Sequence, residues 1–179
     1  DEFLDRPVSK FIPSEQLVVP YTATDLETAE NVTHSIQMSE NELRKKQVAG
    51  FYRDVEVSPS QTEPSEIREE MNNISGVEPS YLDKDVTVLE CHVNLDLFGY
   101  EDEGDDGEKT GIKLPYIVTI SEDSGKVLSI RRNWEKDDPN KQKRQYFVHF
   151  KFLPGFGFYG LGLIHMIGGL SRTATAALR

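Results

Sequence analysis

The sequence predicts an α+β fold, with an antiparallel β-sheet, short helices in the N-terminal half and a long α-helix at the end. Apolar and polar residues alternate in residues 86–98, as in a strand of a sheet with one buried face. Residues 152–179 pass from a glycine- and aromatic-rich run into a stretch with helical spacing of apolar residues. We therefore expect three parts: a mixed helical and extended segment over 1–85, an antiparallel sheet over 86–152, and a glycine-rich turn with a helix over 153–179.

The first part is expected to contain three short helices. Residues 1–20 should be extended, because their three prolines exclude a long helix. After them, a Ser or Thr twice precedes a Glu by three residues, which is the spacing of a capping box. The pairs are Thr24 with Glu27, for a helix over 25–31, and Ser39 with Glu42, for a helix over 40–49 that Gly50 ends. The spacing of Ile67, Met71 and Ile74 predicts a third helix over 65–74.

Four strands are expected in the second part. The first, over 86–98, turns an apolar side that includes Cys91 toward the core and a more polar side that includes His92 away from it. Cys91 is therefore expected in the core, and His92 at the surface or in an interface. Two more strands, over 114–121 and 126–132, are joined by a hairpin turn. The fourth strand is the alternating set Tyr146, Val148, Phe150 and Phe152.

Charge is distributed unevenly along the chain, whose formal net charge is −11. Residues 1–125 carry 28 acidic and 10 basic residues, whereas residues 126–151 carry 8 basic and 3 acidic ones. An acidic body repels the DNA phosphates, so it disfavours non-specific DNA binding but allows a protein that encloses DNA without gripping it. Residues 99–111 lack the spacing of a calcium loop and are expected to be solvated and mobile.

The basic region is a candidate interface with a neighbouring subunit or with an acidic or phosphate-bearing partner. A solvated charged loop is the alternative, because runs of charge are commonly exposed to water. The candidate residues are Arg131, Arg132, Lys141, Lys143 and Arg144.

The final helix is expected to begin near residues 159–163 and to carry a stripe of large apolar residues beside a stripe of small ones. Small side chains let neighbouring helices approach closely, which suits packing in a ring of copies. The small-residue stripe comprises Gly169, Thr173, Ala176 and Ala177. Residues 152–170 carry no formal charge and therefore also raise the alternative of a membrane-insertion segment. Pro154, His165 and six glycines argue against that alternative.

The sequence contains no recognisable catalytic, metal-binding or cofactor-binding set. Cys91 and His92 are adjacent on a strand, so their side chains point to opposite faces and cannot act as a pair. The glycines of residues 155–162 are not followed by the Lys-Ser/Thr of a phosphate-binding loop. We therefore expect a protein that is not an enzyme and has no cofactor. A metal protein or enzyme that uses His92, His149 and the acidic loop is a further alternative.

Several stretches resemble the portal proteins of short-tailed, podovirus-type bacteriophages and of prophages. The most specific is FLPGFGFYGLGLIHMIGGL over 152–170. The others are VLECHVNL over 88–95, LPYIVTI over 114–120, GKVLSIRRNW over 125–134, and DLETAE over 25–30 with His34 and GFYRD over 50–54. The resemblance covers most of the chain. Because the chain begins with Asp1 and stops without a helix-ending residue, we expect it to be the middle of a longer protein.

This resemblance implies a structural subunit of a ring, typically of twelve copies, at one vertex of a phage capsid. Duplex DNA would pass through the central channel during packaging and ejection without sequence-specific contacts. The ring would dock the terminase large subunit during packaging and tail or adaptor proteins afterwards. Residues 1–85 would be wing- or stem-like, residues 86–152 clip-like with its neighbouring region, and the final helix a stem-type helix. The expected location is the virion, after assembly in the host cytoplasm, with no membrane partner.

Overall fold

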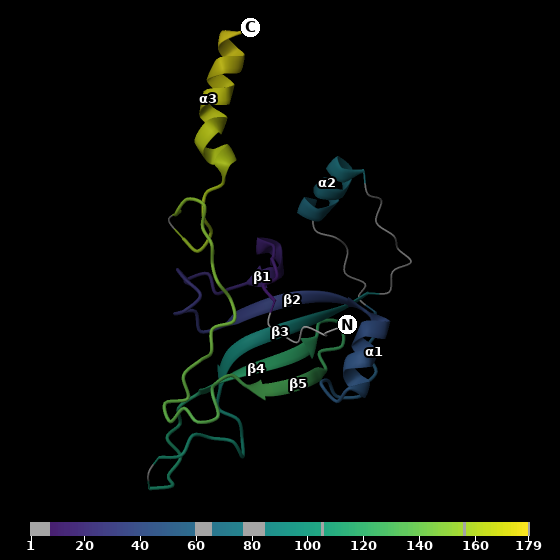
Figure 1. Ribbon diagram of the computed structural model, residues 1–179, viewed down its shortest axis with the longest axis vertical. Helices are drawn as coiled ribbons and strands as arrows, with labels where there is room; N and C mark the ends of the chain where they lie inside the picture. The colour runs from purple at the N-terminus through teal and green to yellow at the C-terminus, as the bar shows by residue number, and fades with distance from the viewer. Residues whose placement is uncertain (1–7, 60–65, 77–84, 105, 156, 179) are drawn as a thin grey trace, which may run out of the picture.

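The computed structural model describes residues 8–59, 66–76, 85–104, 106–155 and 157–178, and its centre is a five-stranded antiparallel sheet (Figure 1). The strands follow one another in the order β1-β2-β3-β4-β5, so each strand pairs with its neighbour in the sequence. The α+β fold class is confirmed. The elements are a 3-10 helix Ser14–Gln16, β1 Leu17–Val18, β2 Val32–Ser39, α1 Glu40–Val48, α2 Glu66–Ser75, β3 Asp85–Leu95, β4 Leu114–Ser121, β5 Val127–Arg132 and α3 Leu163–Ala177.

The local signals around α1 act as predicted. The Ser39 hydroxyl accepts a hydrogen bond from the Glu42 N–H at 3.3 Å, which satisfies one of the free donors at the start of the helix. At the other end, Gly50 adopts a φ of 74°, the left-handed conformation that commonly ends a helix. Leu43 turns the apolar side of α1 onto the sheet and is 4% exposed. The predicted helix over 65–74 is also confirmed, as α2.

The helix predicted over residues 25–31 does not form. Instead, Asp25 closes a turn: its carboxylate accepts hydrogen bonds from the Thr28 N–H at 2.7 Å and from the Thr28 hydroxyl at 2.8 Å. Asp25 therefore caps this segment, and the backbone hydrogen bond from Thr28 lowers its pKa. The chain does not continue into a helix, and it enters β2 at Val32.

Strands β1 and β2 were not predicted from the sequence, and β2 is the longer of the two. β2 pairs with β3 over its whole length, from Val32 opposite His92 to Ser39 opposite Asp85. β3 pairs in turn with β4. β4 pairs with β5, which confirms the predicted hairpin. β3 ends at Leu95, three residues before the expected end of this strand. The segment that follows turns back, with the Tyr100 N–H donating to the Leu97 carbonyl at 2.9 Å.

Both faces of the sheet carry a buried cluster, whereas only the side that contains Cys91 was expected to face the core. The side that contains Val86 and Val88, both 0% exposed, forms the main core with Leu128, α1 and Tyr52. His92 lies on this same side and is 5% exposed, so its predicted surface position is wrong. Cys91 lies on the other side and is only partly buried, so its predicted core position is also wrong. A second cluster, built on Leu114, Tyr116 and Val118, covers that other face.

The predicted fourth strand is extended but unpaired. Among the described residues, no backbone N–H of residues 145–152 donates to a backbone carbonyl, so this segment is not part of the sheet. The chain then makes a narrow glycine-rich loop, closed by the Leu161 N–H donating to the Leu153 carbonyl at 2.8 Å. A Cβ on Gly155 or on Gly160 would lie 2.7 Å from a backbone oxygen, so only glycine fits these two positions. Beyond the loop, α3 projects away from the sheet (Figure 1).

Candidate interaction surfaces

The first candidate surface is the basic region around the end of β5. Arg131 pairs with Glu90, with 3.3 Å between Nη2 and Oε2, and its guanidinium lies 4.6 Å from the centre of the Phe51 ring. Arg132 points to the other face, where its guanidinium lies 5.7 Å from the centre of the Trp134 ring. Arg132 is exposed, and no carboxylate among the described residues pairs with it.

The three basic residues of the following loop are also engaged within the chain. Lys141 pairs with Asp102 of the acidic loop, and this hydrogen bond lowers the pKa of Asp102. The Lys143 ammonium donates to three backbone carbonyls, those of Leu26 at 3.5 Å, Glu27 at 3.2 Å and Ala29 at 3.1 Å. Lys143 therefore ties the loop to the turn before β2, which is a structural role.

Arg144 remains exposed at the surface. Its N–H donates to the Asn133 carbonyl at 3.0 Å, so the loop returns to the end of β5. Its side chain pairs with the exposed Glu135 at 3.3 Å, and exposed pairs of this kind contribute little to stability. Of the five predicted basic residues, the structure thus leaves Arg132 and Arg144 most accessible to a partner.

The acidic loop forms hydrogen bonds and an ion pair of its own. The Gly104 N–H donates to the Glu108 carbonyl at 2.9 Å, and the Thr110 N–H donates to the Asp102 carbonyl at 2.9 Å, which makes a hairpin. The Lys109 ammonium lies 2.8 Å from the Glu101 carboxylate and lowers the pKa of that carboxylate. Within the described residues, no group of three or more His, Cys, Asp or Glu side chains could hold a metal ion.

A partly buried polar network lies beneath the basic region, and the sequence reasoning did not find it. His92 Nε2 lies 3.2 Å from Glu90 Oε1, and Arg131 holds the other carboxylate oxygen. The hydrogen bond from His92 lowers the pKa of Glu90, which outweighs the opposite effect of burial. His34 lies opposite Glu90 on β2, and burial lowers its pKa. The signal was the spacing of Glu90 and His92, which places both side chains on the same side of one strand.

The second candidate surface is a row of four large side chains on the unpaired segment, named here the apolar row. Its members are Tyr146, Val148, Phe150 and Phe152, which are 55%, 94%, 88% and 62% exposed. The alternate residues point inward and hold the segment in place. Phe147 packs against the cluster of Leu26, Ala29, Val32 and Phe158, His149 stacks on Phe158 at 4.3 Å, and the Lys151 ammonium donates to the Thr24 carbonyl at 3.3 Å.

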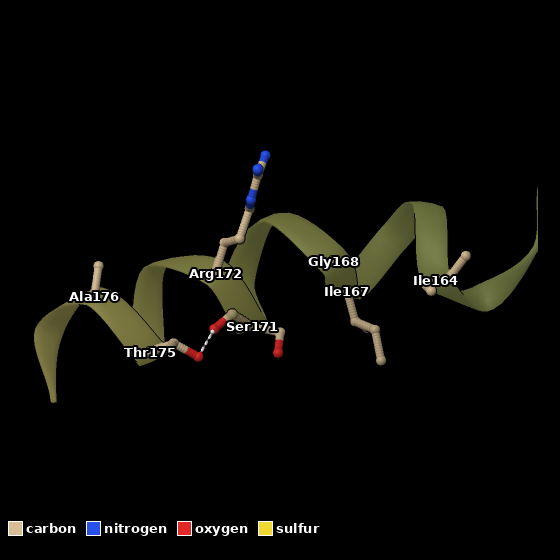
Figure 2. A pocket seen from close by; sticks show the side chains of 7 residues that line it. All are labelled: Ile164, Ile167, Gly168, Ser171, Arg172, Thr175 and Ala176. Atoms are coloured by element: carbon tan, nitrogen blue, oxygen red, sulfur yellow. Dashed lines mark hydrogen bonds between the residues drawn. The ribbon is translucent and has the colours of Figure 1, made fainter. Parts of the chain in front are cut away.

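The third candidate surface is α3. None of its residues is buried, and it contacts no other helix or strand of the described residues. A hollow of about 480 Å³ is lined by residues of this single helix, so it is an open surface and no enclosed site. Figure 2 labels the seven lining residues. Gly169 and Thr173 lie one turn apart, with the Thr173 hydroxyl donating to the Gly169 carbonyl at 3.0 Å. A Cβ on Gly169 would meet nothing within 4 Å.

The predicted small-residue stripe is thus exposed along one side of α3. Helical geometry places Gly169, Thr173, Ala176 and Ala177 next to the large apolar residues Leu163, Ile167 and Leu170, which are 56%, 49% and 72% exposed. Among the described residues, no helix is long and apolar enough to cross a membrane. No protein-family model and no curated protein matches the sequence.

Proposed function

We propose that this chain is part of a portal-type ring subunit, a structural protein whose copies surround a channel for duplex DNA. The observation that carries the proposal is α3, an amphipathic helix with no buried residue and no helix or strand partner among the described residues. Apolar surface of this extent is stabilised by burial against another surface. The resemblance of the sequence to portal proteins supports neighbouring subunits as that surface.

The charge of the chain supports the same proposal. A net charge of −11 suits the wall of a channel through which DNA slides, because an acidic wall does not hold the phosphates. The ring would have about the twelve copies typical of the resembled family, and it would act as a conduit without enzymatic activity of its own. It would dock the terminase large subunit and later a tail or adaptor protein, at the portal vertex of the virion.

Electron microscopy of the negatively stained full-length protein tests ring formation directly. The expected result is rings with a central hole wide enough for a DNA duplex. Monomers or small closed dimers under assembly conditions would refute the proposal.

A pair of matched variants tests the role of α3. Gly169→Leu places a large side chain in the small-residue stripe and should lower the yield of rings. Gly168→Leu is the control, because Gly168 lies on the same helix, on a different side, with nothing within 4 Å of its Cβ position either. Both changes replace a helical glycine and favour the helix equally. Equal ring yields from the two variants would contradict the packing role of the stripe.

The accessible arginines are the proposed docking points for the terminase or the adaptor. Arg132→Glu and Arg144→Glu should weaken partner binding while leaving the rings intact. Lys136→Glu is the control, since Lys136 is exposed in the same loop. Lys143 is left unchanged in this test because its contacts are structural. Partner binding that is unaffected by both arginine variants would exclude this surface.

The alternative function is membrane association through residues 152–170. The exposed apolar residues of α3 favour it, although a helix of 15 residues is shorter than the roughly 20 residues that a span requires. Flotation of the full-length protein with anionic vesicles tests it, and protein that remains at the bottom of the gradient would exclude it.

A further inference from the structure

Two apolar surfaces of this chain lie away from the core and do not meet each other. The first is the apolar row on the segment 145–152. The second is the side of α2 that carries Met71 and Ile74, which are 55% and 78% exposed. These two residues are three positions apart, so they lie on the same face of the helix. α2 contacts no other helix or strand of the described residues, and it stands apart from the sheet in Figure 1.

The two surfaces carry opposite charge. Residues 141–151 contain four basic residues and no acidic one, and Arg144 lies over the ring of Tyr146 at 5.6 Å. α2 contains Glu66, Glu69 and Glu70 against one arginine. Helical geometry places Glu70 beside the face of Met71 and Ile74, whereas Glu69 lies on the opposite side of the helix. An apolar face with Glu70 beside it therefore matches an apolar row in which Arg144 lies exposed over the Tyr146 ring. The other three bases of the segment are engaged within the chain.

The exposed apolar area of the row is large enough to form part of a protein interface. At about 150–250 Å² for a whole aromatic side chain, the three exposed rings of the row present roughly 400 Å². That is half of the ~800 Å² that each partner buries in a typical stable interface. The four side chains alternate along an extended segment, so they form a flat strip about as long as a helix of three turns.

We propose that the apolar row is the docking site for α2 of a second copy of this chain. Such a contact joins two different surfaces, so it is head-to-tail, and repeated contacts of this kind close into a ring. The inference rests on the proposed ring function and names one of its subunit contacts. It places Phe150 near the centre of the strip, against Met71 and Ile74 of the neighbouring copy, with Glu70 of that copy facing Arg144.

Site-specific photo-crosslinking of the full-length protein tests the contact. Phe150 is replaced by p-benzoylphenylalanine, and Phe98, which is 94% exposed in the acidic loop, is replaced in the same way as a control. Unlabelled protein is mixed with ¹⁵N-labelled protein before assembly, so that mass spectrometry separates crosslinks between copies from those within one copy. The expected product from position 150 is a covalent dimer whose crosslinked peptide contains residues 66–75 of the other copy, and position 98 should not yield that peptide.

Three outcomes would overturn the proposal: crosslinks to 66–75 within one copy, crosslinks to another part of the neighbour, or crosslinks to lipid when vesicles are present. Microscopy of the same samples distinguishes a failure of this contact from a failure of the proposed ring function. Rings that form without the crosslink to 66–75 would overturn this contact and leave the ring function standing. Samples without rings would overturn the ring function itself, and the contact with it.

Charge substitution gives a second, independent readout. Phe150→Glu should weaken association about 30-fold, which is the effect of losing one central aromatic anchor. Phe150→Lys should be milder, because the facing helix is acidic. Phe98→Glu is the control and should assemble normally. Far-ultraviolet circular dichroism should be unchanged in all three, since both positions are exposed. Equal assembly of the Glu and Lys variants at position 150 would contradict the proposed acidic neighbour.

Discussion

Replacing Lys143 by methionine should lower the free energy of unfolding. The change leaves all other charged residues in place. The Lys143 ammonium serves three backbone carbonyls of residues 26–29, two of them at 3.2 Å or closer, and so joins segments more than 110 positions apart in the sequence. Methionine keeps the length and apolar part of the side chain but removes the donors. A hydrogen bond to a charged group contributes about 1.5–3 kcal/mol, and the site is only partly buried, so we expect a loss of ~2 kcal/mol.

Urea unfolding of the 179-residue chain measures this loss. Trp134, the single tryptophan, packs edge-on against Tyr116 at 5.3 Å and reports on the unfolding of the sheet. Lys136→Met is the control, since Lys136 lies exposed in the same loop and makes no hydrogen bond or ion pair with the described residues. Equal unfolding midpoints for the two variants would refute the structural role of Lys143, and the residue would then return to the candidate docking surface.

Three further predictions concern the stability of the same chain. Leu128→Ala should cost about 2–5 kcal/mol in urea unfolding, because this side chain is 0% exposed in the main core. Ser39→Ala should cost ~1 kcal/mol by losing the cap of α1, and Ser39→Asp should retain most of the stability, as thermal unfolding will show. His34→Gln should reduce the loss of stability between pH 7.5 and pH 5.5. Burial lowers the pKa of His34 below its ordinary 6.5, so the unfolded chain binds more protons there and the fold weakens as the pH falls. Burial also lowers the pKa of His149, so His34→Gln should remove only part of the loss of stability at low pH. An unchanged pH profile of the unfolding midpoint would refute the assignment to His34.

Elements whose signals are local were predictable from the sequence. α1 is specified by Ser39 at one end and Gly50 at the other, and both adopt the expected roles. The hairpin of β4 and β5 is specified by alternation and by a turn in which Gly125 has a φ of 63°. β2 also has the alternation of a strand, because Val32, Ile36 and Met38 lie an even number of residues apart. The polar residue His34 interrupts this apolar series and makes the pattern hard to recognise.

Features that depend on distant partners were not predictable. The alternation of residues 146–152 is real, yet a strand also needs a neighbour with which to form hydrogen bonds, and no neighbour is present here among the described residues. His92 belongs to the buried side, where Glu90 contacts both His92 and Arg131; the spacing of Glu90 and His92 indicates the first contact, but Arg131 lies 41 positions away from Glu90 in the sequence. The basic residues looked free in the sequence, since Lys143 finds its carbonyls only after the chain has folded back.

The order of pairing has a consequence for synthesis on the ribosome. β2 is complete at Ser39, but its partner β3 begins only at Asp85, 46 residues later. At about 5–20 residues per second, β2 waits roughly 2–9 s for that partner to be translated. During this time its Val32 and Met38 are exposed together with an open strand edge, which is the state most prone to aggregation. β4 and β5 need no such delay, because five residues separate them. The nascent chain is therefore most in need of chaperone protection while residues 40–85 are emerging.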